Sequence, residues 1–194
     1  MIPFLKAVWT NTFHLLVDDG RLASGAVLGL LVSWLFAAVA PNDSIRVFAG
    51  PLLFGSAVVA SLDVGRFHWS DTVPLPLQIG ALALFALGMA LAVWAMAVNK
   101  FFSSVVRIQK ERGHHLITSG PYRFVRHPGY TGMLFGGLAS PLAMGSWWAL
   151  APAAVYALLV LRRAIIEDRF LMESLEGYKA FSGQVRHRLV PGLW

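Results

Sequence analysis

Long uncharged runs constrain this chain more than any other feature of its sequence. Val73–Asn99 is a run of 27 residues without a charge, and Tyr130–Leu161 is a run of 32. An α-helix needs about 20 apolar residues to cross a bilayer. Only 13% of the 194 residues are charged, against roughly 25% in an average soluble domain. The chain is therefore predicted to be an all-α integral membrane protein.

The apolar runs predict five membrane-spanning helices. The first three are Leu22–Ala40, Val47–Leu62 and Val73–Asn99. As one helix, Tyr130–Leu161 would be about 48 Å long, which is too long for one ordinary span. Ser140-Pro141 and Gly145-Ser146 lie near its middle, so we expect the last two spans to form a helical hairpin.

Residues 1–194 are predicted to form one membrane domain. Residues 1–99 would hold an interfacial segment, Met1–Arg21, and the first three spans, and residues 100–194 would hold the functional region. Between the second and third spans, Asp63 and Arg66 are interpreted as an exposed ion pair at a helix end. Lys100–Arg112 alternates aromatic or aliphatic residues with basic ones, which predicts a helix on the membrane surface that ends at Gly113.

Charge predicts the orientation. Of the 16 Lys and Arg residues, six lie in Lys100–Arg126 and six in Arg162–Arg188, so both segments should face the cytoplasm. The net charge of +6 is assigned to this topology and to anionic lipid head groups, and not to nucleic acid. The chain has no cysteine, which excludes disulfides, thiolate metal sites and a cysteine nucleophile.

Two polar segments are candidates for a functional site. The connection R-G-H-H-L-I-T-S-G-P-Y-R-F-V-R-H-P-G-Y-T-G places histidines, arginines and tyrosines between apolar blocks. In the last predicted helix, Arg163 and Glu167 are four residues apart and lie on one face. Ionisable residues at the end of an apolar helix indicate either a site or a solvated helix extension. The tail with Tyr178 and Phe181 could cover a ligand from the cytoplasmic side.

The motif G-P-Y-R-F-V-R-H-P-G-Y-T-G, preceded by H-H-L-I and followed by R-A-I-I-E-D, resembles the isoprenylcysteine carboxyl methyltransferase family and related phospholipid methyltransferases. The resemblance covers roughly residues 113–191. It implies an S-adenosylmethionine site facing the cytoplasm and no metal. The residues that it implies at the cofactor are His114, His115, Leu116, Ile117, Tyr122, Arg126, His127, Pro128, Gly129, Tyr130 and Glu167. The family's usual Glu-Glu is Glu167-Asp168 here, and only the first acid matches a cofactor contact.

The same resemblance implies the reaction. A substrate carboxylate is already a nucleophile, so the enzyme must mainly place and desolvate it. Arg163 is the predicted substrate-binding and catalytic residue, because its guanidinium can hold a carboxylate in bidentate fashion. An amine acceptor would need a base, for which Glu167 is the candidate. The implied substrate is a prenylcysteine or another lipid, reached in the plasma membrane of a prokaryote or the endoplasmic reticulum of a eukaryote.

Two alternatives have different cofactor requirements. Membrane sterol and steroid reductases bind NADPH, but their motif tends to read R-H-x-N-Y-x-G followed by an acid, where this chain has Gly129 and Met133. A non-catalytic membrane protein would bind no cofactor. The physiological acceptor and the oligomeric state are not predicted by the sequence.

Overall fold

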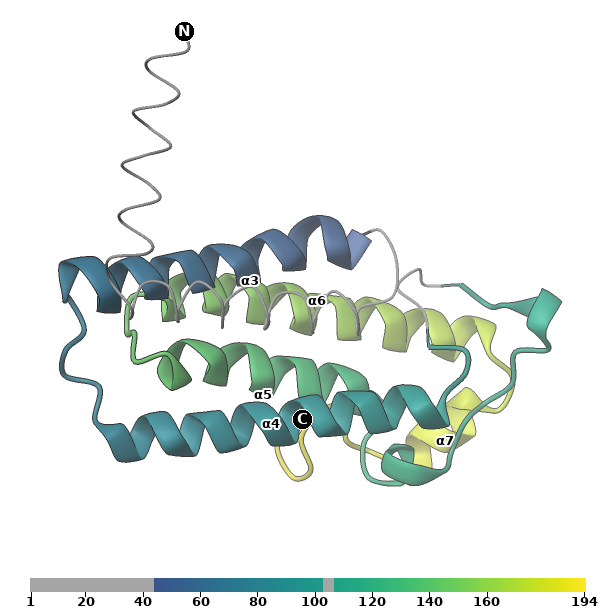
Figure 1. Ribbon diagram of the computed structural model, residues 1–194. Coiled ribbons are helices and arrows are strands. Elements are labelled where there is room, and N and C mark those ends of the chain that lie inside the picture. Colours follow the sequence, from purple (N-terminus) through teal and green to yellow (C-terminus); the bar gives the residue numbers. More distant parts are fainter. Residues whose placement is uncertain (1–43, 103–106) are drawn as a thin grey trace, which may run out of the picture.

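The computed structural model describes residues 44–102 and 107–194, and the regular elements in those ranges are helices. They are α3 (Ser44–Leu62), a π-helical turn (Asp63–Phe67), α4 (Leu75–Val98), α5 (Pro128–Ala143), α6 (Leu150–Ser174) and α7 (Tyr178–Gln184), with 3-10 turns at Lys110–Arg112 and Gly120–Arg123. Helices α3 to α6 form an aligned bundle, and α7 lies near one end of it (Figure 1). The predicted segment Met1–Arg21 and span Leu22–Ala40 lie outside the described residues.

Helix α4 coincides with the third predicted span. It starts one residue after Pro74 and ends before Asn99, whose backbone N–H still bonds to the Ala95 carbonyl. Pro76 lies in the first turn, where a missing N–H leaves no helix bond unmade. Among the described helices, α4 alone is long and apolar enough to cross a membrane by itself. The five-span topology stays a prediction.

The apolar run Tyr130–Leu161 is divided between two helices. Helix α5 ends at Ala143 and α6 begins at Leu150. The connection turns at Gly145, whose φ of 82° favours glycine. Helix α6 continues beyond the apolar run to Ser174, so Arg163, Glu167 and Asp168 belong to the same rigid element as the apolar residues.

Helices α4 and α5 touch through their backbones. A Cβ atom on Gly132 would lie 2.3 Å from the carbonyl oxygen of Gly88, and one on Gly88 would lie 2.7 Å from the carbonyl oxygen of Gly132. No real Cβ atom approaches another atom so closely, so both positions require glycine. This contact sets the height of α5 along α4, and therefore the position of Tyr130 in the first turn of α5.

The interpretation of Asp63 and Arg66 as an exposed ion pair is wrong. Asp63 is 0% exposed and its Oδ2 accepts hydrogen bonds from the hydroxyls of Ser70 and Ser146. Arg66 is exposed and its guanidinium lies 5.8 Å from the centre of the Phe67 ring. The wider π-helical turn removes the α-helical i,i+3 geometry on which the interpretation depended. Asp63 instead joins the α3–α4 connection to the α5–α6 turn.

The predicted surface helix over Lys100–Arg112 is also wrong for the described part of that range. Residues 99–102 and 107–109 are not helical, and only a 3-10 turn forms at Lys110–Arg112. Gly113 ends this turn with a φ of 63°. The Asn99 side chain accepts a hydrogen bond from the Phe101 backbone N–H at 3.0 Å, and the Phe101 side chain is buried. The connection therefore folds back over the end of the bundle.

Candidate functional site

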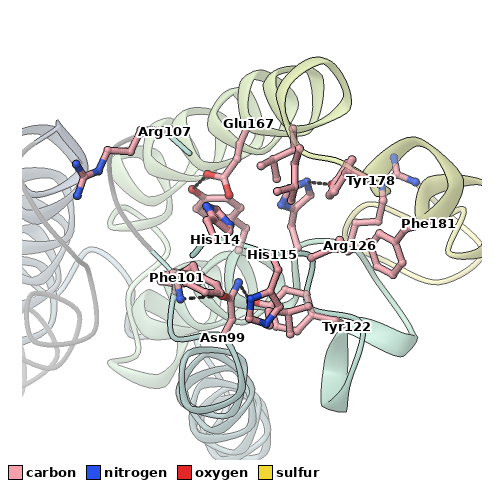
Figure 2. Close-up of a pocket in the computed structure, with 17 residues that line it drawn as sticks. Asn99, Phe101, Arg107, His114, His115, Tyr122, Arg126, Glu167, Tyr178 and Phe181 are labelled. Carbon is pink, nitrogen blue, oxygen red and sulfur yellow. Dashed lines mark hydrogen bonds between the residues drawn. The ribbon is translucent and has the colours of Figure 1, made fainter. Parts of the chain in front are cut away.

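A cavity lies at the end of the bundle where α4 ends and α5 begins. Its walls come from the residues after α4, the start of α5, the second half of α6 and α7 (Figure 2). The predicted residues that line it are His114, His115, Leu116, Ile117, Tyr122, Arg126, His127, Tyr130 and Glu167, with Tyr178 and Phe181 from the tail. The lining residues that the sequence did not predict are Asn99, Phe101, Phe102, Arg107, Leu171 and Leu175.

Three predicted residues do not line the cavity. A Cβ on Gly129 would lie 2.6 Å from the Phe102 ring, so Phe102 covers that glycine and Pro128 stays buried in the helix start. Neither residue lines the cavity, and a direct contact of Pro128 and Gly129 with the cofactor stays a prediction. Arg163 lies one layer behind the wall, with its Nε donating to the Tyr130 hydroxyl at 3.2 Å.

Tyr130 links the cavity to Arg163 and Glu167. Its hydroxyl donates to Glu167 Oε2 at 2.7 Å, and Arg163 Nε lies 3.8 Å from the same Glu167 oxygen. Arg163 Nη2 is buried and has no hydrogen-bond partner among the described residues. A buried guanidinium N–H without a partner is costly. Arg163 Nη2 can therefore donate to an anionic ligand without first losing a hydrogen bond to another described residue.

His114 is held rigidly. Its Nδ1 accepts a hydrogen bond from the backbone N–H of Gln109 at 3.2 Å, and its ring stacks on Phe101 with centroids 4.5 Å apart. Gln109 is buried and its own side chain donates to the Phe101 carbonyl at 2.8 Å. Burial, and then the neighbouring His115, lower the pKa of His114. The ring is neutral at pH 7.

Asp168 is the centre of a buried polar cluster. It is 1% exposed and accepts from Arg126 Nε at 2.8 Å, His127 Nε2 at 3.2 Å, the Tyr178 hydroxyl at 2.8 Å and Arg188 Nε at 2.8 Å. Burial alone would raise the pKa of Asp168, but the hydrogen bonds from His127, Arg126, Arg188 and Tyr178 hold that pKa well below its ordinary value. Asp168 is therefore ionised at neutral pH.

The polar cluster explains why the C-terminal segment lies against the motif. Arg126 donates through its Nη1 to the carbonyls of Val185 and Arg186 at 2.8 and 2.9 Å. The backbone N–H of Arg126 bonds to the His187 carbonyl at 3.0 Å, and that of His127 to the Arg188 carbonyl at 2.9 Å. The Arg126 guanidinium, which was expected to contact the cofactor, is thus used to hold Asp168 and the tail.

Tyr122 is positioned by α4. Its hydroxyl accepts from Asn99 Nδ2 at 3.1 Å, and burial raises its pKa to about 12. The phenol therefore stays neutral and offers the cavity one aromatic face. Asn99 was assigned to the end of a span, and it reaches the cavity because α4 ends there.

Asp168 was the most important residue that the sequence did not identify. The sequence did contain a sign of its role. Adjacent residues on a helix point about 100° apart, so Asp168 cannot share the surroundings of Glu167 and needs partners of its own. Those partners are Arg126 and Arg188, which are 42 and 20 residues away.

Within residues 44–102 and 107–194, no group of three or more His, Cys, Asp and Glu residues could hold a metal ion.

A family model and two of the relatives carry methyltransferase names. A family model described as phospholipid methyltransferase matches residues 77–176. The protein-S-isoprenylcysteine O-methyltransferase of Schizosaccharomyces pombe is 34% identical over 71 residues, which are 36% of this chain and 30% of that protein. A probable protein-S-isoprenylcysteine O-methyltransferase of Oryza sativa subsp. indica is 49% identical over 39 residues, which are 20% of each chain.

A further relative has a different name. The cobalt-zinc-cadmium resistance protein CzcN of Cupriavidus metallidurans is 32% identical over 130 residues, which are 64% of this chain and 55% of that protein. The matched regions thus span about half or less of the length of these relatives.

Proposed function

We propose that this chain, which belongs to the phospholipid methyltransferase family, is an S-adenosylmethionine-dependent membrane methyltransferase that methylates the carboxylate of a lipophilic substrate such as a prenylcysteine. The observation that carries the proposal is the convergence of nine predicted cofactor residues on one cavity. These residues come from segments as far apart as His114 and Glu167, so a solvated loop would have no reason to bring them together.

The cavity fits the cofactor chemically. Phe101, Tyr122 and Tyr130 offer aromatic faces for a purine base or a sulfonium cation. Glu167 can accept from hydroxyl or ammonium groups, and His114 can donate to an acceptor. When bound, the cofactor would supply an electrophilic methyl group.

Arg163 supports a carboxylate as the acceptor. Its Nε bonds to Tyr130, while its buried Nη2 lacks a partner among the described residues. A substrate carboxylate at Nη2 would complete the hydrogen bonds of the guanidinium and would be held away from water. Because Tyr130 lies between Arg163 and the cavity, Arg163 would hold the methyl acceptor at the edge of the cofactor site and not inside it.

A phospholipid amine is the second candidate acceptor, and the description of the family model favours it. An amine must lose a proton, and Glu167 is the acidic residue on the cavity wall. However, Glu167 Oε2 already accepts the Tyr130 hydroxyl at 2.7 Å. A base role would use the other carboxylate oxygen.

The first experiment is calorimetric titration of the detergent-purified protein with S-adenosylhomocysteine, with NADPH in parallel. We expect saturable binding of the first ligand alone. Binding of NADPH alone would overturn the proposed function and support a reductase. Transfer of a labelled methyl group to farnesylcysteine or to phosphatidylethanolamine then separates the two acceptors.

Arg163→Ala tests the acceptor site. Methyl transfer to farnesylcysteine should fall by roughly 100-fold or more, as expected for a lost charged hydrogen bond in a dry site, while the cofactor Kd should change only a few-fold. Arg162→Ala is the matched control, because Arg162 is adjacent and exposed. Equal losses of cofactor binding and transfer would move Arg163 into the cofactor site.

A multi-pass topology with the cavity facing the cytoplasm is part of the proposal. Arg66 is the one Lys or Arg between residues 47 and 99, whereas twelve lie in Lys100–Arg126 and Arg162–Arg188. The chain has no cysteine, so Asp71→Cys and Lys179→Cys each introduce a single thiol at an exposed position at opposite ends of the bundle. In sealed vesicles, an impermeant maleimide should label the two from opposite sides. Labelling from the same side would contradict this topology.

A further inference from the structure

Helix α4 exposes large apolar side chains from its first residue, Leu75, to Trp94 near its end. At 1.5 Å per residue the rise between these two positions is about 28 Å, which matches the roughly 30 Å of the hydrocarbon core of a bilayer. Trp69 and Trp148 are exposed beside the start of this stretch. Because tryptophan is enriched at both membrane–water interfaces, Trp94 lies at the depth expected for the second interface, at the cavity end.

The 3-10 turn Gly120–Arg123 packs against this end of α4. The Tyr122 hydroxyl lies 3.4 Å from the Ala95 carbonyl oxygen, and a Cβ on Gly120 would lie 2.9 Å from the Val98 side chain. Figure 1 shows the turn beside the C-terminal part of α4. The turn therefore reaches back along α4 to a level inside the helix, next to the depth of Trp94, and does not extend away from the bundle.

The outer side of the turn combines an exposed aromatic ring with an exposed cation. Phe124 is 64% exposed. Arg123 is also exposed, and it has no ion-pair partner among the described residues. Tyr122, in contrast, is buried and lines the cavity. An aromatic ring beside a basic side chain suits the surface of a membrane, because the ring can enter the upper acyl chains while the cation pairs with a lipid phosphate.

The backbone of the turn makes its own hydrogen bonds. Pro121 has no N–H group, and the N–H groups of Tyr122 and Phe124 bond to the carbonyls of Ser119 and Pro121 at 3.2 Å each. Unpaired backbone groups are costly where water is scarce. These N–H groups therefore lose no hydrogen bond when the turn enters the head-group layer.

We propose that residues 120–124 are a membrane anchor whose partner is the phospholipid head-group layer at the cavity end of the bundle. The Phe124 ring lies among the upper acyl chains, and the Arg123 guanidinium binds a lipid phosphate. The inference rests on the membrane topology in the proposed function, but neither Arg123 nor Phe124 belongs to the proposed cofactor or acceptor site. Because Tyr122 belongs to the same turn, the anchor holds one wall of the cavity at the depth of the lipid head groups.

Single spin labels test the depth of the turn, because the chain has no cysteine. Phe124→Cys is compared with Leu87→Cys, on the exposed face of α4, and with Lys110→Cys, an exposed residue of the polar connection. The proteins are placed in vesicles of phosphatidylcholine and phosphatidylglycerol. Collisions with oxygen report lipid, and collisions with a water-soluble nickel chelate report water. The oxygen-to-nickel ratio of Phe124→Cys should lie between those of the two references and several-fold above that of Lys110→Cys.

The two references separate failure of the anchor from failure of the proposed function. If Leu87→Cys is in lipid, a Phe124→Cys ratio equal to that of either reference would overturn the proposed depth. Low collision rates of Phe124→Cys with both reagents would also overturn the anchor, because a protein surface and not lipid would then cover the turn. A Leu87→Cys ratio equal to that of Lys110→Cys would instead contradict the membrane topology of the proposed function.

A charge reversal tests the phosphate contact. In the Phe124→Cys background, Arg123→Glu should repel the head-group layer and lower the oxygen-to-nickel ratio toward that of Lys110→Cys. The effect should increase with the fraction of phosphatidylglycerol in the vesicles. Arg169→Glu is the matched control, since Arg169 is an exposed arginine on α6, and it should leave the ratio unchanged. Equal ratios with and without Arg123→Glu would overturn the contact between Arg123 and a lipid phosphate.

Discussion

The two ends of the helix bundle each contain a buried aspartate, and these residues are held in different ways. Asp168, near the cavity, is surrounded by Arg126, Arg188, His127 and Tyr178. Asp63, at the opposite end, accepts hydrogen bonds from two serine hydroxyls, and its other carboxylate oxygen has no partner among the described residues. The cavity end thus uses charge pairing, which needs many segments, whereas the far end uses neutral hydrogen bonds within two neighbouring turns.

The same contrast holds for the surfaces of the two ends. Phe67, Trp69 and Trp148 are exposed near Asp63, with Phe67 stacked on Trp69 at 4.6 Å. Aromatic side chains of this kind are typical of a membrane–water interface. The cavity end carries most of the basic residues. One end is therefore suited to anchoring the bundle and the other to binding polar ligands.

Removing the Asp168 carboxylate should have the largest effect. Asp168→Ala leaves the buried guanidinium of Arg126 and the partly exposed guanidinium of Arg188 without their anion, and should lower the free energy of unfolding by about 3–5 kcal/mol. Asp63→Ala, by comparison, leaves hydroxyls that still accept from the backbone N–H groups of Trp147 and Ala149, and should cost about 1–3 kcal/mol. Chemical unfolding in detergent measures both. A larger loss for Asp63→Ala would reverse the comparison.

Acid should weaken the cavity end through the same carboxylate. Because the pKa of Asp168 is lower in the folded state than in the unfolded state, its contribution is present above the unfolded pKa of about 3.9. That contribution is lost as the pH falls below this value toward the folded pKa. The stability difference between wild type and Asp168→Asn should therefore be constant from pH 8 to about 5 and should shrink below pH 4. A difference that grows on acidification would contradict the assignment.

A methyl group at the contact of α4 with α5 should have an intermediate effect. Gly132→Ala places a Cβ 2.3 Å from the Gly88 carbonyl oxygen, and the helices must separate at a cost of about 1–3 kcal/mol. Gly80→Ala is the matched control on α4, because no atom lies within 4 Å of its added Cβ. The control should be neutral or stabilising by up to about 1 kcal/mol. Equal midpoints in thermal unfolding would show that the contact is not tight.

The smallest effect is expected at the far end. Ser146→Ala removes one of two hydroxyls on Asp63 and should cost about 0.5–1.5 kcal/mol, without changing the affinity for S-adenosylhomocysteine. Ser182→Ala serves as the control, since its hydroxyl is near the surface and bonds to the Lys179 carbonyl. A change in cofactor affinity in Ser146→Ala would mean that the two ends are coupled through α5 and α6.

The sequence predicted best what depends on local pattern. The bounds of α4 followed from an uncharged run with a proline at its start, whereas nine of the 17 residues that line the cavity were implied by the resemblance of the motif to a family. Prediction from the sequence failed where two residues that contact one another are far apart in the chain. Asp63 lies 83 residues from Ser146, and Asp168 meets Arg126 only after the tail has folded back. The burial of Phe101 depends on a chain reversal at Asn99, for which an alternation of aromatic and basic residues gave no signal.

The Asp168 cluster has a consequence for biosynthesis. Tyr178, Arg188 and the carbonyls of Val185 and Arg186 follow α6 in the chain. When α3 to α6 have been made, the Arg126 and Asp168 side chains therefore have each other and His127, but lack the other four groups that hold them. The bundle of α3 to α6 can therefore form before the cavity closes. The cavity would be complete only after the segment that contains Tyr178 and Arg188 has been synthesised and has docked.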